Sequence, residues 1–95
     1  MSDTISLGSI IQLSGFSAAG HSHLNIIRKI VGAFVRSLTD KKLQVENLTL
    51  ILNQQEKAAI TATIILPEKT LTEEAVNQNL FMAISEALRK LEAQL

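Results

Sequence analysis

The chain contains no cysteine, no tryptophan and no tyrosine, and its only aromatic residues are three phenylalanines. Without cysteine it can form neither disulfides nor a thiolate metal site, and it has no thiol nucleophile; this is typical of an intracellular protein. Three aromatic rings are too few for a surface on which nucleic-acid bases stack. These absences exclude disulfide-stapled scaffolds and aromatic nucleic-acid binders.

The chain also lacks an excess of positive or negative charge. Nine lysines and arginines balance nine acidic residues, so RNA binding would need a local basic patch. No apolar run approaches the roughly 20 residues that a membrane-spanning helix requires, and the N-terminus lacks the pattern of a signal peptide. We therefore expect one soluble, cytoplasmic domain over residues 1–95, with residues 1–9 frayed and no membrane contact.

Two stretches have the spacing of amphipathic helices. In residues 79–95, the apolar side chains fall within an arc of about 100°. They are Leu80, Ile84, Ala87, Leu88, Leu91 and Leu95. Residues 23–38, with Ser22 as the N-cap, carry a wider apolar stripe of about 140°. It consists of Leu24, Ile27, Ile30, Val31, Phe34, Val35 and Leu38.

Three stretches alternate as strands do: residues 10–16, 43–53 and 58–66. In the first, alternation places Phe16 on the face opposite to Leu13. A helix between the first two strands favours a parallel crossover, and the later strands favour antiparallel hairpins. Both helices would then cover one face of the sheet, which is an α+β fold.

The segment before the last helix has two interpretations. Thr70 and Glu73 have the spacing of a capping box, which favours one long helix from Leu71 onward. The alternative is a further strand over residues 70–76, with a turn at residues 77–79. The residues alone leave both open.

The C-terminal third nevertheless resembles a known family. The matching residues are Ala62-Thr63-Ile64, Pro67, Leu71, Leu80-Phe81-Met82-Ala83-Ile84-Ser85-Glu86 and Lys90-Leu91-Glu92-Ala93-Gln94-Leu95, with Ile27-Arg28 and Val31 matching more loosely. They are similar to the ribosome hibernation-promoting factor family, which includes ribosome-associated translation inhibitors and sigma-54 modulation proteins. The chain resembles a short, divergent form. The resemblance implies a β-α-β-β-β-α order, a four-stranded mixed sheet with two helices on one face, and a strand at residues 70–76.

The resemblance also implies a function. Members of the family bind the small ribosomal subunit near its decoding region through basic residues on the two helices, and so inhibit translation in idle or stressed cells. Contacts of this kind to rRNA phosphates position a protein without reading sequence. The candidate rRNA-binding residues are Arg28, Lys29, Arg36, Lys41, Lys42, Arg89 and Lys90. Of these, Arg28 and Lys90 match basic positions of the family.

A second hypothesis comes from positions at which the chain differs from this family. Phe34, Ser37 and Ala93 stand where members of the family often carry basic residues. The alternative is therefore a non-enzymatic module that binds proteins or itself, keeping the fold without rRNA binding. An exposed edge strand would offer a site for homo-oligomer formation.

The sequence does not indicate an enzyme. Glu73 and Glu74 are adjacent, so on a strand they point to opposite faces and cannot share a substrate. His21 and His23 lack further ligands nearby, so we assign them to the turn and cap of the first helix. Residues 14–20 match no phosphate-binding fingerprint. We predict no catalytic residue, no metal and no cofactor.

Overall fold

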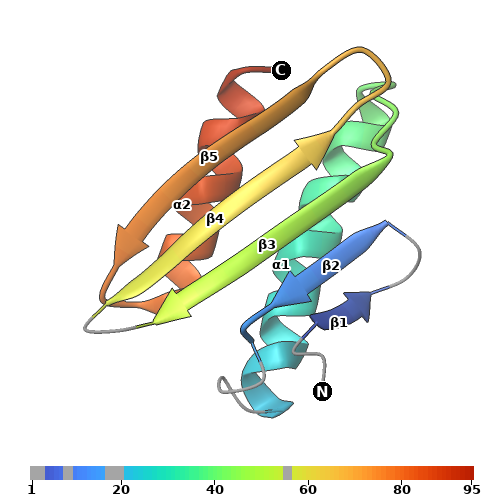
Figure 1. Ribbon diagram of the computed structural model, residues 1–95. Helices are drawn as coiled ribbons and strands as arrows, with labels where there is room; N and C mark the ends of the chain where they lie inside the picture. The colour runs from blue at the N-terminus through green and yellow to red at the C-terminus, as the bar shows by residue number, and fades with distance from the viewer. Residues whose placement is uncertain (1–3, 8–9, 17–20, 55–56) are drawn as a thin grey trace.

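The computed structural model, which describes residues 4–7, 10–16, 21–54 and 57–95, folds into two layers (Figure 1). One layer is a sheet in the order β1-β2-β3-β4-β5, and the other holds two helices on one face of that sheet. In chain order the elements are β1 (Thr4–Leu7), β2 (Ile11–Ser14), α1 (His21–Asp40), β3 (Asn47–Gln54), β4 (Ala58–Ile65), β5 (Thr70–Asn77) and α2 (Leu80–Ala93). The α+β architecture with both helices on one face is confirmed.

The sheet is mixed, as predicted. β2 and β3 are parallel and joined by α1, whereas β3, β4 and β5 form antiparallel pairs. The sheet nevertheless has five strands where the sequence predicts four. β1 pairs antiparallel with β2, so the expectation of a frayed start is wrong for residues 4–7. The remainder of that stretch, residues 1–3 and 8–9, lies outside the described residues.

Residues 70–77 form β5, so the strand interpretation is confirmed and the single long helix is wrong. β5 pairs with β4 along its whole length, which places Ala75 opposite Ile60 and Leu71 opposite Ile64. Ala75 is buried and Leu71 packs against the core. A local capping pattern stabilises a helix end by about 1 kcal/mol, and the pairing of eight residues with β4 together with the burial of Ala75 outweighs it.

The helix ends differ in detail from the prediction. α1 begins at His21, so Ser22 lies in its first turn and is not the N-cap. α2 is capped by Asn79, whose side-chain oxygen accepts hydrogen bonds from the backbone N–H groups of Phe81 (2.9 Å) and Met82 (3.2 Å). Such a cap satisfies donors that the helix itself leaves unpaired, and it fixes where α2 starts.

Phe16 lies in the core and not on the opposite face of the sheet, contrary to the prediction. The alternation of β2 stops at Ser14, and Gly15 follows with a φ of 80°. That left-handed conformation returns the next side chain to the side of Leu13. A Cβ atom on Gly15 would also overlap the carbonyl oxygen of Leu52, so the site requires glycine.

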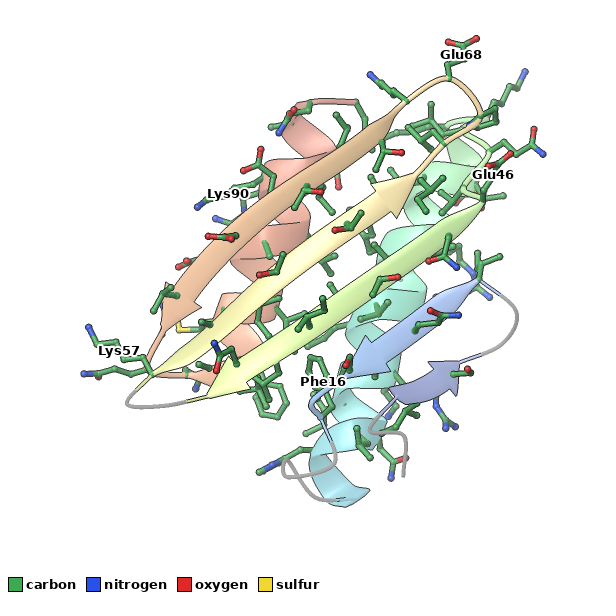
Figure 2. The ribbon with its side chains drawn as sticks, in the orientation of Figure 1. Phe16, Glu46, Lys57, Glu68 and Lys90 are labelled. Atoms are coloured by element: carbon green, nitrogen blue, oxygen red, sulfur yellow. The ribbon has the colours of Figure 1, made fainter. Side chains whose placement is uncertain are left out.

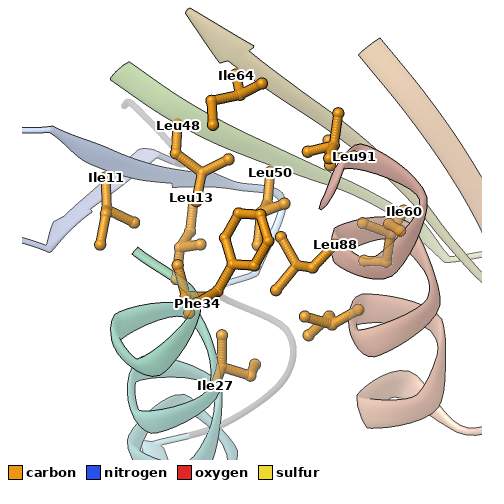
Figure 3. Close-up of a cluster of buried hydrophobic side chains, with 14 of the residues drawn as sticks. Ile11, Leu13, Ile27, Phe34, Leu48, Leu50, Ile60, Ile64, Leu88 and Leu91 are labelled. Atoms are coloured by element: carbon orange, nitrogen blue, oxygen red, sulfur yellow. The ribbon is translucent and has the colours of Figure 1, made fainter. Parts of the chain in front are cut away.

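The core lies between the helices and the sheet (Figure 3). Ile27 and Phe34 from α1 and Leu88 from α2 meet Leu13 and Leu50 from the strands. Both predicted apolar stripes therefore face the sheet, which leaves the charged sides of α1 and α2 exposed. Among the described residues, no buried polar side-chain atom lacks a hydrogen bond. No helix in this part of the chain is both long and apolar enough to cross a bilayer.

Candidate nucleic-acid interface

Although the net charge of the chain is zero, its basic and acidic residues are separated along the sequence. Residues 28–42 contain five basic side chains and one acidic one, whereas residues 46–86 contain six acidic side chains and two basic ones. The first stretch belongs to α1 and the turn after it, and the second mainly to β3, β4 and β5. α1 and the turn after it are therefore the positive part of a protein whose net charge is zero.

The exposed flank of α1 carries a cluster of three cations: Arg28, Lys29 and Arg36. Arg28 and Arg36 lie two helical turns apart on one line, because residues four apart share a face. All three line an open hollow of about 500 Å³. Its remaining lining residues are Gly32, Ala33, Ser37 and Asp40. None of the three cations forms an ion pair within the described part of the chain.

A second hollow separates the two helices. This interhelical groove has a volume of about 640 Å³, and Phe34 and Leu88 contribute apolar surface to it. Lys41 and Arg89 lie at its polar margin. Ala33 lines both the groove and the hollow on α1, so the two form one continuous surface. We call this surface the α1 basic surface; its cations are Arg28, Lys29, Arg36, Lys41 and Arg89.

One acidic residue interrupts the groove. Glu92 Oε1 accepts a hydrogen bond from Lys41 Nζ at 3.1 Å, which joins the end of α2 to the turn after α1. About half of each side chain is exposed, so the pair contributes at most about 1 kcal/mol to stability. Its larger effect is to cancel part of the positive charge at this end of the groove.

Two of the seven predicted residues lie elsewhere. Lys90 Nζ donates a hydrogen bond of 2.7 Å to the backbone carbonyl oxygen of Glu74, beside β5 (Figure 2). Glu86 and Gln94, one turn before and after Lys90, also hydrogen-bond side chains of β5. This flank of α2 faces away from the groove. Lys42 lines a separate hollow of about 320 Å³ with Leu66, Pro67 and Leu95 among others.

The α1 basic surface also contains residues that the sequence reasoning did not select. Gly32 and Asp40 line the hollow on α1, and Glu92 lines the groove. Gly32 could have been identified from the sequence, because it lies four residues from an arginine on each side and therefore shares their face of the helix. Glu92 could not be placed from sequence, because its partner Lys41 is 51 positions away.

One comparison with known proteins gives a match. The chain is similar to a solved structure of a ribosomal subunit interface protein from Coxiella burnetii. The two share 26% sequence identity with a TM-score of 0.50, over 63% of this chain and 76% of that one. No protein-family model and no curated protein matches the chain. The similarity supports the α+β fold and is in loose agreement with the family resemblance.

His23, Glu73 and Glu74 do not lie together in a metal-ligating cluster among the described residues. No group of three or more metal-ligating side chains converges there. The ring of His23 lies edge-on to the ring of Phe81, with centroids 5.5 Å apart. Glu73 contacts Gln94 of α2, whereas Glu74 alternates to the outer face of the sheet, so the two carboxylates diverge as predicted.

Proposed function

We propose that this protein binds the small ribosomal subunit through the α1 basic surface and thereby inhibits translation in idle or stressed cells. The observation that carries the proposal is the gathering of five exposed cations on one side of a fold that is similar to that of a ribosomal subunit interface protein. Most acidic side chains belong to residues 46–86, outside the α1 basic surface, so an RNA surface would attract α1 and orient the domain before contact.

The chemistry suited to this surface is contact with rRNA phosphates. Arginine offers a planar set of donors that matches a phosphate, and the three arginines of the surface make no ion pair within the described residues. Four or five such contacts predict an affinity that falls on the order of a hundredfold between 50 and 200 mM salt. Base-specific recognition is not required for this mode of binding.

Inhibition would follow from occupancy. The domain measures 35 × 24 × 21 Å, which is large enough to cover an RNA groove on the subunit. If it binds near the decoding region, as the resemblance implies, it would exclude mRNA and tRNA from that region. No covalent step is needed, and release would depend on salt, competing ligands and concentration.

Sedimentation with purified small subunits tests the proposal. The wild type should sediment with subunits at low salt and dissociate at moderate salt. Arg28→Glu combined with Arg36→Glu should weaken association by about tenfold or more, because two phosphate contacts become repulsive. The matched control is Lys57→Glu combined with Lys69→Glu, which makes the same change in net charge away from the α1 basic surface.

The control variant should bind as the wild type does. Absence of association at low salt would overturn the proposal. Equal losses of binding for the two double variants would also overturn it, because binding would then depend on the net charge of the protein and not on the α1 basic surface.

The alternative function is self-association through an exposed edge strand, and one observation at β5 argues against it. The carbonyl oxygen of Glu74 lies on the free side of β5, and Lys90 already occupies it. A lysine at this position is a common way of preventing one sheet edge from pairing with another. Homo-oligomer formation through an edge strand therefore stays a prediction, and sedimentation equilibrium of the isolated protein tests it.

A further inference from the structure

Gly32 lies in the middle of α1, on its exposed flank. A glycine in a helix interior destabilises it by roughly 0.5–1 kcal/mol relative to alanine. Where two elements pack closely, such a glycine is needed because a side chain would not fit. Here a Cβ atom would meet no atom within 4 Å, so nothing in the fold requires the glycine.

Gly32 is flanked by basic residues. Arg28 and Arg36 lie one turn to either side of it, so the three form a line along α1 that spans about 12 Å. The hollow of about 500 Å³ lies over this line, with Lys29 on its margin. The two arginines thus flank one helical position that has no side chain.

We propose that this hollow binds one sugar–phosphate strand of RNA, with Arg28 and Arg36 each holding a phosphate and Gly32 allowing the strand to lie against the helix backbone. The inference rests on the proposed function and adds to it the path of the bound strand. The N–H groups within a helix are already bonded, so the contact at Gly32 is steric, with a Cα–H facing a phosphate oxygen.

The close approach matters because of the reach of the two arginines. A side chain at position 32 would hold the strand away from the helix and lengthen both guanidinium–phosphate contacts. Charge-assisted hydrogen bonds lose most of their strength when they lengthen beyond normal hydrogen-bond distance. Asp40 lies at the far end of the same hollow and repels phosphate, which confines the strand to the part between Arg28 and Arg36.

Substitutions at Gly32 should therefore move stability and affinity in opposite directions. Gly32→Ala and Gly32→Leu should both raise the melting temperature, because each improves helix propensity at an exposed site. Affinity for small subunits should fall roughly fivefold for Leu, the equivalent of one lost hydrogen bond, and less for Ala. Asn25→Gln is the control, since it changes an exposed, uncharged position of α1 outside the hollow.

The outcomes separate this inference from the proposed function. If Arg28→Glu with Arg36→Glu abolishes sedimentation but Gly32→Leu binds as the wild type does, the strand does not contact Gly32, and the inference is overturned while the function stands. A second readout is the NMR signal of the Gly32 amide during titration with a single-stranded RNA oligonucleotide.

If the wild type does not sediment with subunits, yet this amide signal shifts and Gly32→Leu weakens the RNA complex, the proposed function is overturned and the RNA site stands. No shift and no sedimentation would overturn both.

Discussion

Lys90 Nζ donates a 2.7 Å hydrogen bond to the carbonyl oxygen of Glu74, so Lys90 lies on the flank of α2 that faces β5. Because Lys90 faces β5, its neighbour Arg89 faces the groove between the helices. Adjacent residues of one helix, both basic and both exposed, thus belong to different surfaces. The family resemblance selected Lys90, whereas the geometry favours Arg89 for contact with RNA.

This pair gives a direct prediction. Arg89→Met should weaken binding to small subunits several-fold and leave stability unchanged, because it removes a cation from the groove. Lys90→Met should leave binding unchanged and lower the free energy of unfolding by less than about 1 kcal/mol, because the lost hydrogen bond is exposed. Urea unfolding and subunit sedimentation measure the two quantities. A larger loss of binding for Lys90→Met would contradict the assignment.

Asp40 is the acidic residue of the hollow on α1. Asp40→Asn should raise the affinity for subunits a few-fold, since it removes a repulsive charge beside the phosphate path. It should also raise stability by a few tenths of a kcal/mol, because a negative charge at a helix C-terminus is unfavourable. Glu74→Gln, an equal change of charge on β5 outside the α1 basic surface, should leave binding unaltered. Unchanged binding for both variants would indicate that phosphate does not approach Asp40.

Gly15 and Gly32 should respond in opposite ways to alanine. Gly15→Ala places a Cβ against the Leu52 carbonyl in a left-handed conformation, so it should destabilise the fold by about 2 kcal/mol or more. Gly32→Ala, in open space, should stabilise it by roughly 0.5–1 kcal/mol. Thermal unfolding of both variants checks the contrast, and a stable Gly15→Ala would disprove the arrangement of the turn after β2.

Asn79 caps the start of α2. Asn79→Ala should lower the free energy of unfolding by about 1 kcal/mol, because the N–H groups of Phe81 and Met82 lose their acceptor. Asn79→Asp should retain most of the stability, since a carboxylate also caps a helix. Gln78→Ala, an exposed neighbour, is the control in the same urea titration. Equal stability of the Asn79→Ala variant and the wild type would rule out this cap.

The helices and the core could be predicted because their signals are local and repeat along the chain. The stripe that includes Ile27 and Phe34, and the one that includes Leu88, face the sheet as the periodicity predicts. β1 was missed because four residues are too few for alternation to be recognised. Phe16 was placed on the wrong face because one glycine with a positive φ interrupts the alternation.

The remaining errors concern long-range contacts. The spacing of Thr70 and Glu73 favours a helix locally, and only pairing with β4 makes the segment a strand. The candidate site shows the same limit. All seven predicted cations are exposed, but the sequence could not tell which flank of its helix each one occupies, nor that Glu92 pairs with Lys41. The roles of these cations in RNA binding stay predictions.

The most direct test of the central claim is the salt dependence of binding to purified small subunits. The slope of log K against log salt should be about −3 to −4 for the wild type. It should fall in magnitude by roughly 1.5 for Arg28→Gln combined with Arg36→Gln. A salt-independent affinity, or the same slope for both proteins, would contradict the account, because the α1 basic surface would then carry no phosphate contacts.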